Sequence, residues 1–506
     1  MSVRLTPLDA WAAARAAGGE RPGRPLPAPP AAAPAHGDPI GSAEVAAPAG
    51  RLDPDAMRRH QRAALRATVA LAQAGAFYAE RLAGVEATAL ELDDLAALPF
   101  TTADDIRERG DRMLCVPATQ VERIVTLPTS GTSGVPKRLR FSAADQELTV
   151  DFFCHGMSVL ARAGDRVAVL LPCERPGGVG DLLRLGLERL GATPVLHGPV
   201  GDVGAALGWL ERERATVVVG IPVQVLALAR HTLAEGRALA PRTVLLSTDH
   251  APRALVAAIE DAWGCRVFDH YGTTETGLGG GVECEAHAGL HLREADLLFE
   301  VVEPTSGRPL PDGDEGEIVF TTLTREAMPL IRYRTGDLGR LLPGRCPCGS
   351  LLRRLGTVRA RLADVAPLPG GGRLALADVD EALFGVPGVL DFWARLDDDE
   401  RGERLAVEVA LEGGGGAAAC RRAAAALERA PALAAACASG RLRVEVVAAE
   451  RPWSGGDGTS KRRLLDRRHG VTTTAAPFDE TSGGPSPVTR HGKPGVVGPA
   501  VGREET

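Results

Sequence analysis

The sequence predicts an α/β protein: a large domain on a mostly parallel sheet, a β-rich unit beside it, and a small C-terminal α+β domain. Three observations support this fold class. Apolar runs alternate with helical segments over residues 162–269, which is typical of a parallel sheet. Residues 297–342 hold short apolar runs separated by Gly, Asp and Pro turns. A second pattern of strands and helices follows residue 356.

The elements expected in the large domain begin with a helix over residues 57–81, where Leu65, Val69, Ala72 and Phe77 recur near one face. The α/β region then predicts strands and helices in alternation: strands 167–171, 193–196, 216–221, 244–246 and 267–268, with helices 180–190 and 222–234 between them. The β-rich unit predicts strands 297–302, 317–321 and 330–333. The small domain predicts helix 377–383, strands 389–396 and 404–411, helix 417–429 and strand 442–447.

Composition sets the expected domain boundaries. Residues 1–50 are rich in Ala, Pro and Gly, and residues 466–506 in Gly, Pro, Ser and Thr, so both are expected to be disordered. Between them we expect the large domain over residues 51–355 and the small domain over residues 356–465.

The basic residues of the chain are almost all arginines. The 506 residues carry 58 Lys+Arg against 65 Asp+Glu, and the net charge of −7 gives no general attraction to nucleic acid or an anionic membrane. Only three are lysines, namely Lys137, Lys461 and Lys493. Because arginine stands nearly everywhere else, these lysines mark candidate positions that need a compact ammonium group.

The apolar runs are too short to cross a membrane. The longest, residues 216–229, contains Pro222 and Gln224. The first residues lack the pattern of a secretory signal, and nine cysteines is an odd number, which favours reduced thiols. We therefore expect a cytoplasmic protein that binds neither nucleic acid nor membrane.

The first segment with chemical character is Leu127-Pro-Thr-Ser-Gly-Thr-Ser-Gly-Val-Pro-Lys137. Gly131 and Gly134 allow backbone N–H groups to converge, the hydroxyl side chains add donors, and Lys137 adds charge, which together suit a polyphosphate. The spacing differs from that of a Walker A loop. A flexible Ser/Gly linker is the alternative interpretation.

The second segment, Asp269-His-Tyr-Gly-Thr-Thr-Glu275, follows an apolar strand. At the carboxyl end of a strand, Tyr271 can stack on a base, Thr273 or Thr274 can bond a phosphate oxygen, and Glu275 can hold Mg²⁺. The alternative is a turn with a structural tyrosine.

Two further segments complete the set. In Ile331-Arg-Tyr-Arg-Thr-Gly-Asp-Leu338, Asp337 at a glycine turn can accept both ribose hydroxyls. Gly455-Gly-Asp-Gly-Thr-Ser-Lys461 is a glycine loop that ends in the second rare lysine. An ordinary β-turn and a flexible linker are the respective alternatives.

The order and spacing of these four segments resemble the AMP-forming adenylating enzymes (acyl-CoA synthetases), in particular the phenylacetate–CoA ligases. Residues 77–81, 95–102, 282–291 and 346–349 also match that branch, and the resemblance covers residues 57–465. It implies a large adenylate-forming domain and a small mobile domain that carries the catalytic lysine.

The resemblance also implies roles for individual residues. Lys461, Thr274 and Glu275 would be catalytic, with Glu275 on Mg²⁺. The phosphate loop would consist of Thr129, Ser130, Gly131, Thr132, Ser133 and Gly134 with Lys137. Tyr271, Gly272 and Thr273 would contact the adenine and the α-phosphate, and Asp337 would bind the ribose. A looser match to an adenine-contacting segment lies at Ser247, Thr248 and Asp249. Family members usually carry Gly-Arg-x-Asp at the hinge, where this chain has Gly356-Thr-Val-Arg-Ala-Arg361; Arg359 would substitute, and the hinge Asp is missing.

Cys284, His291, Cys346 and Cys348 form a candidate zinc site, because a structural Zn²⁺ takes four such ligands. The alternative is a set of turn cysteines without metal. His155, His270 and His287 are interpreted as structural histidines, and residues 152, 153 and 157 as core rather than an acyl pocket.

The function predicted is an ATP-dependent, AMP-forming carboxylate–CoA ligase. It would make an acyl-adenylate and then an acyl-CoA thioester, using ATP, Mg²⁺, coenzyme A and a small carboxylic acid. An adenylating enzyme that loads a separate carrier protein and a catalytically inactive nucleotide-binding homologue are the alternatives. Both a monomer and a homodimer are compatible with the sequence.

Overall fold

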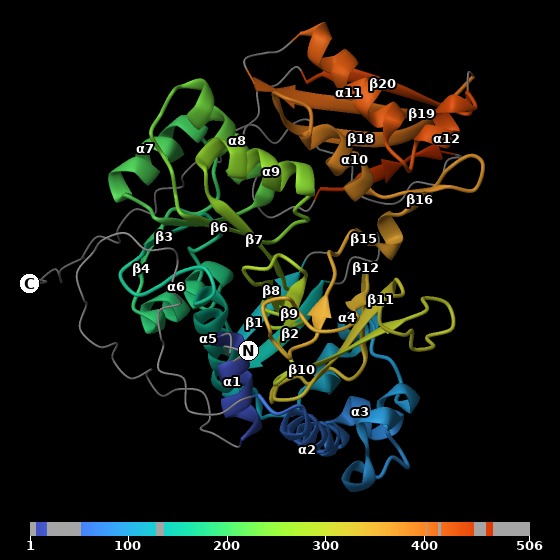
Figure 1. Ribbon diagram of the computed structural model, residues 1–506. Helices are drawn as coiled ribbons and strands as arrows, with labels where there is room; N and C mark the ends of the chain where they lie inside the picture. The colour runs from blue at the N-terminus through green and yellow to red at the C-terminus, as the bar shows by residue number, and fades with distance from the viewer. Residues whose placement is uncertain are drawn as a thin grey trace, which may run out of the picture.

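The computed structural model describes residues 7–17, 52–127, 136–400, 402–412, 416–449 and 462–468. A nine-stranded sheet with helices on both faces forms the centre of the large domain, and a β-rich sheet packs beside it (Figure 1). The small unit, coloured orange to red, lies at one end of the large domain (Figure 1). The predicted fold class is confirmed.

The nine-stranded sheet has the order β13-β14-β9-β8-β7-β6-β5-β3-β4 and is parallel from β4 to β7 and antiparallel from β7 to β13. Its strands are β3 (Arg166–Val169), β4 (Thr193–Leu196), β5 (Val217–Gly220), β6 (Thr243–Leu246), β7 (Arg266–Tyr271), β8 (Gly281–Glu283), β9 (Leu290–Leu292), β13 (Leu341–Leu342) and β14 (Arg354–Leu355). The flanking helices are α5 (Ala143–Met157), α6 (Val179–Leu190), α7 (Val203–Glu213), α8 (Pro222–Ala234) and α9 (Arg253–Trp263).

The central strands β5 and β6 are buried along their whole length. Helices cover both faces of a parallel sheet, so such strands are continuous apolar runs rather than alternating ones. This explains why their positions could be predicted from composition. The carboxyl ends of β6 and β7 meet at one edge, where ligands of open α/β sheets bind.

The β-rich sheet has the order β10-β11-β12-β15. Its strands are β10 (Leu297–Val302), β11 (Gly316–Thr322), β12 (Tyr333–Gly339) and β15 (Ala360–Arg361). The predicted strand over residues 330–333 is wrong, because β12 begins only at Tyr333. Arg332 has a φ of +46° and turns its guanidinium to Glu300, which interrupts an extended backbone.

The helix predicted over residues 57–81 is two helices, α2 (Pro54–Gln73) and α3 (Ala76–Arg81). Gly75 is extended at the start of α3 and ends the run. The chain continues through α4 (Ala103–Arg109) to an antiparallel hairpin of β1 (Val121–Leu127) and β2 (Lys137–Ser142). Short 3₁₀ turns lie at Ala87–Ala89, Leu92–Ala97, Gly110–Met113, Ala118–Gln120 and Leu362–Asp364.

Residues 7–16 form a helix, α1 (Pro7–Ala16), so the prediction of disorder is wrong for this part of residues 1–50. Leu8, Trp11 and Ala12 are buried in the core of the large domain. The apolar side chains give α1 a face to bury, which the Ala/Pro composition of the whole segment concealed. Figure 1 shows α1 beside α5.

The small unit holds a four-stranded sheet of order β20-β19-β18-β21. Its elements are α10 (Leu376–Phe384), β18 (Val389–Asp399), β19 (Gly402–Leu411), α11 (Ala417–Arg429), α12 (Ala434–Ala438), β20 (Leu442–Ala448) and β21 (Leu464–Asp466), after a hairpin of β16 (Ala366–Pro367) and β17 (Arg373–Leu374). The expected end of this domain at residue 465 is too early. Arg468 is 6% exposed and pairs with Glu403 and Asp466.

Among the helices of the described ranges, none combines the length and the apolar character that a membrane crossing requires.

Candidate active site

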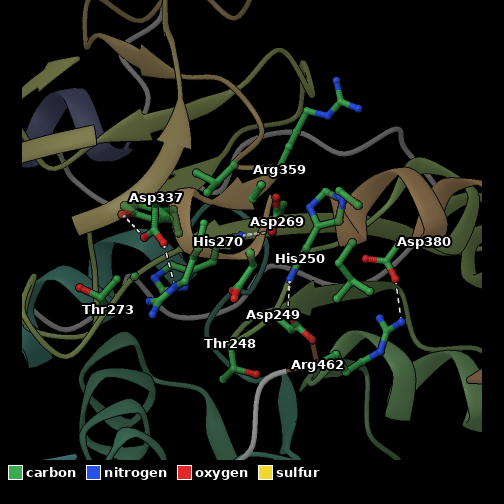
Figure 2. Close-up of a pocket in the computed structure, with 18 of the residues that line it drawn as sticks. Thr248, Asp249, His250, Asp269, His270, Thr273, Asp337, Arg359, Asp380 and Arg462 are labelled. Atoms are coloured by element: carbon green, nitrogen blue, oxygen red, sulfur yellow. Dashed lines mark hydrogen bonds and ion pairs between the residues drawn. The ribbon is translucent and has the colours of Figure 1, made fainter. Parts of the chain in front are cut away.

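A pocket of about 130 Å³ lies between the large domain and the small unit (Figure 2). Its walls come from the loops after β6 and β7, from β12 and β15, and from α10 and the segment at residues 462–463. The parallel sheet and the small unit therefore build one site together.

The loop after β6 contributes Thr248 and Asp249 to this pocket. Thr248 has a φ of +77°, a conformation that non-glycine residues rarely adopt. Ser247 instead lines a neighbouring apolar pocket, where its Oγ lies 3.1 Å from Nδ1 of His270. Of the three residues predicted here, two thus face the first pocket and one faces the second.

The segment after β7 contributes Tyr271, Gly272 and Thr273. A Cβ at Gly272 would lie 2.4 Å from the carbonyl oxygen of Leu278, so only glycine fits. Thr273 caps the following turn, since its Oγ1 accepts the backbone N–H of Thr276 at 3.2 Å. The backbone therefore runs close to the pocket in one fixed path.

Asp337 on β12 lies in the same pocket and is 5% exposed. Tyr271 donates its hydroxyl to Oδ2 of Asp337 at 2.9 Å, and Nε of Arg361 lies 3.1 Å from Oδ1. Burial, together with the charge of Asp337, raises the pKa of Tyr271 well above 10, so Tyr271 remains a donor. Two donors thus fix the carboxylate predicted to bind ribose.

Glu275 is buried and forms an ion pair with Lys137, the first residue of β2. Tyr333 donates its hydroxyl to the same Oε1 at 3.1 Å. Burial alone would raise the pKa of Glu275, but the Lys137 charge outweighs it and holds the pKa below its ordinary value. Glu275 is therefore an anion near neutral pH, as metal binding requires.

The small unit contributes Asp380 and Arg462 to the pocket. Nη2 of Arg462 lies 2.7 Å from Oδ1 of Asp380 (Figure 2). Nε of Arg462 lies 3.1 Å from Oδ1 of Asp391. Burial raises the pKa of Asp380 to about 7 although Arg462 opposes this. Arg359 also lines the pocket, and it pairs with Asp378 at 2.7 Å.

Several predicted site residues lie outside the described residues: Thr129, Ser130, Gly131, Thr132, Ser133, Gly134 and Lys461. Residues 129–134 lie between β1 and β2 in the sequence, and the pairing of Leu127 with Lys137 holds the adjacent ends of these two strands together. Thr274 is half-buried and follows Thr273 on the turn after β7.

The four predicted zinc ligands converge. The ligand atoms of Cys284, His291, Cys346 and Cys348 all lie within 4.8 Å of one another. The Sγ atoms of Cys284 and Cys346 are 3.6 Å apart, and Sγ of Cys348 is 3.4 Å from Nε2 of His291. Two sulfurs each about 2.3 Å from one tetrahedral ion would lie about 3.8 Å apart, so the donor set and spacing fit zinc.

Sequence reasoning missed two residues of this site. Arg361 was overlooked in favour of Arg359, because both follow the same glycine and only the pairing of β12 with β15 places Arg361 against Asp337. His270 was interpreted as structural, yet it lines both pockets. The position of His270 inside the second motif was the available signal.

Fold and site together define a nucleotide-binding α/β protein with a second unit over its pocket. A family model described as AMP-binding enzyme matches residues 52–323, more than half of the chain. The chain belongs to this family of AMP-binding enzymes.

Individual relatives agree with that assignment. The phenylacetate-coenzyme A ligase of Thermus thermophilus is 32% identical over 59% of this chain and 68% of its own length. The phenylacetate-coenzyme A ligase of Pseudomonas putida is 31% identical over 62% of this chain and 73% of its own length. A 2-hydroxyisobutyryl-CoA ligase structure, solved with its acyl-adenylate in the postadenylation state, has a TM-score of 0.69 at 22% identity and covers 81% of this chain and 89% of its own.

Proposed function

We propose that this protein is an ATP-dependent, AMP-forming carboxylate–CoA ligase whose acid is of the kind that phenylacetate-CoA ligases use. One observation carries the proposal: the polar pocket after β6 and β7 adjoins an apolar pocket, and His270 lines both. An adenylating enzyme must bring a polar nucleotide and an acyl group to one point.

The nucleotide would bind through the residues of the polar pocket. Asp337, held by Tyr271 and Arg361, would accept the ribose hydroxyls. Gly272 lines this pocket, and its backbone would approach the adenine and the α-phosphate. Residues 129–134 and Lys137 would bind the outer phosphates.

Two anions must meet in the first half-reaction, because a carboxylate attacks the α-phosphate and pyrophosphate leaves. Catalysis is then largely charge neutralisation and positioning. Lys461 would lie between the two anions, and a compact ammonium suits that place better than a planar guanidinium. The neighbouring Arg462 lines the pocket, which supports this assignment.

Glu275 would hold Mg²⁺, which screens the charge of the phosphates when bound. Its carboxylate is buried and ionised beside Lys137. Lys137, whose ammonium pairs with Glu275 in this structure, would bind a phosphate oxygen.

We also propose that Cys284, His291, Cys346 and Cys348 hold a structural Zn²⁺. Backbone N–H groups of Ala286 and Ser350 point at the sulfurs of Cys284 and Cys348, at 3.4 and 3.5 Å. Such bonds stabilise thiolate ligands. The metal would join the loop after β8 to the loop before β14.

The test is a pyrophosphate-release screen over aryl and aliphatic acids, with and without CoA, followed by identification of AMP and acyl-CoA. We expect release with at least one aryl acid and a thioester product when CoA is present. Release without a CoA-derived product would favour a separate carrier protein as acceptor. No release with any acid would favour the inactive homologue. Size measurement in solution would decide whether the protein is a homodimer, and fractionation would test the expected cytoplasmic location.

A further inference from the structure

The apolar pocket contains one polar pair in an otherwise apolar wall. Its apolar lining includes Phe152, Phe153 and Met157 on α5 and Leu183 on α6. Its remaining lining side chains are apolar as well, except those of Ser247 and His270. A group that enters this pocket therefore meets hydrocarbon everywhere except at this pair.

His270 has one nitrogen in use and one without a partner. Nδ1 lies 3.1 Å from Oγ of Ser247, whereas Nε2 is buried and has no hydrogen-bond partner among the residues that the structure describes. Phe153 packs against the ring at a centroid distance of 6.4 Å and an interplanar angle of 66°. A buried polar atom without a partner is costly and uncommon, and often belongs to a binding or catalytic site.

The imidazole is neutral near pH 7, because burial lowers the pKa of His270 to about 4. A neutral ring carries one N–H and one lone pair. If the Ser247 hydroxyl donates to Nδ1, then Nε2 is a donor; if it accepts from Nδ1, then Nε2 is an acceptor. A hydroxyl group satisfies both cases, whereas a charged substituent would be buried without a counter-ion.

We propose that the apolar pocket binds the acyl group of an acid that bears a hydroxyl, and that this hydroxyl pairs with Nε2 of His270. This inference rests on the proposed function and names the class of its acid. Ser247 is then a positioning residue, since it fixes the ring and the tautomer. A site that hydrogen-bonds a substrate hydroxyl discriminates strongly against the analogue that lacks it.

The experiment compares matched acids by calorimetric binding, with a non-hydrolysable ATP analogue and Mg²⁺ present. The acids are an arylacetic acid, its three ring-hydroxylated isomers, and a branched aliphatic acid with and without a hydroxyl. We expect at least one hydroxylated acid to bind the native protein ten-fold or more tightly than its parent. In His270→Leu that preference should fall below about three-fold, as expected when a hydrogen bond is replaced by apolar contact.

Two variants control for structure. His231→Leu removes a histidine of α8 that bonds within its own helix, and it should keep the preference. His270→Gln, whose amide both donates and accepts, should recover part of it. Thermal melting of each variant verifies that it is folded.

The inference is overturned if no acid binds, if the native protein binds parent and hydroxylated acids equally, or if His270→Leu keeps the preference. Pyrophosphate release is measured separately. A hydroxyl preference in binding without pyrophosphate release would contradict the proposed function and leave the inference intact. Pyrophosphate release with no hydroxyl preference would support the proposed function and overturn the inference.

Discussion

At the scale of single residues, the site depends on hydrogen bonds and charges between residues far apart in the chain. Tyr271 on β7 and Asp337 on β12 come from different sheets, and Lys137 on β2 pairs with Glu275 on the turn after β7. Asp337 and Glu275 each have a cationic and a hydroxyl partner that fix the direction of the carboxylate. Changes of one atom at these positions should therefore alter binding or rate more than stability.

The three lysines allow a matched comparison. Lys461→Arg should slow acyl-adenylate formation by about 10²-fold or more, because a guanidinium cannot take the place of an ammonium between two anions. The affinity for ATP should change little. Lys493→Arg is the control and should leave both quantities unchanged. Near-normal pyrophosphate release by Lys461→Arg would contradict the assignment.

The tyrosines offer a second pair of variants. Tyr271→Phe removes the hydroxyl that donates to Asp337, and loss of one hydrogen bond worth about 1 kcal/mol should raise the KM for ATP about five-fold. Tyr78→Phe is the control, because its hydroxyl bonds Thr101 at 2.8 Å and Tyr78 is not among the residues that line the pocket. It should lower the melting temperature and leave the KM for ATP unchanged. If Tyr271→Phe left the KM for ATP unchanged, the ribose would bind elsewhere.

Asp269 predicts a pH dependence of stability. Burial, with the nearby Glu283, raises the pKa of Asp269 to about 7, whereas an unfolded Asp titrates near 4. The folded state therefore holds the proton more tightly, so this contribution is complete below about pH 4 and is lost as pH rises toward 7. Asp269→Asn keeps the oxygen that accepts the His270 N–H.

We compare the free energy of unfolding of the ligand-free Asp269→Asn variant with that of the native protein. The difference should shift in favour of the variant by about 1 kcal/mol or more as the pH rises from 5 to 8. Denaturant unfolding at the two pH values measures the difference. A constant difference across this range would show that Asp269 is ionised in the folded state.

At the scale of elements, the sequence was most informative where an element buries itself locally. The bounds of α8, α11 and β4 were predicted correctly. Helix α8 begins at Pro222, a residue favoured in the first turn of a helix. Strand 330–333 was misplaced because Leu330 and Ile331 are buried in a turn, and an apolar pair does not distinguish a turn from a strand. The pairing that brings Arg361 to Asp337 joins β12 to β15 within one sheet, between segments apart in the sequence, and has no local signal.

The cysteine cluster gives a prediction at this scale. Purified protein expressed with adequate zinc should contain about one zinc per chain, and Cys284→Ser should lose most of it, because a closed site needs all four ligands. The melting temperature should fall as well. Cys420→Ser, on α11, is the control and should keep the metal. Native protein without zinc would exclude the proposed site.

At the scale of the whole molecule, the pocket is complete only when both units contribute to it. Asp249 and Asp337 belong to the large domain, whereas Asp380 and Arg462 belong to the small unit. Lids and small domains of this kind commonly move during turnover. We expect the small unit to reorient between the two half-reactions. It must keep its own structure during this movement so that its pocket residues return to the same positions.

Arg462 is the centre of the small unit's internal rigidity. Its guanidinium pairs with Asp380 and lies 4.5 Å from the ring centroid of Phe392. Arg462→Leu would leave Asp380 buried without its partner and should cost about 3 kcal/mol. Arg443→Leu breaks a half-exposed pair with Asp399 and should cost less than about 1 kcal/mol. Denaturant unfolding compares them, and equal losses would contradict this account.

Helix α1 has a consequence for the order of folding during synthesis. Trp11 donates to Asp151 at 2.6 Å, Arg15 pairs with Asp296, and Asp9 accepts from Ser350 at 2.8 Å, so its partners lie 140, 281 and 341 residues away. A ribosome that adds about 5–20 residues per second needs about 20 to 70 s to reach the last of them. Helix α1 can therefore dock fully only after these partners have been made, and until then its apolar face is available to chaperones.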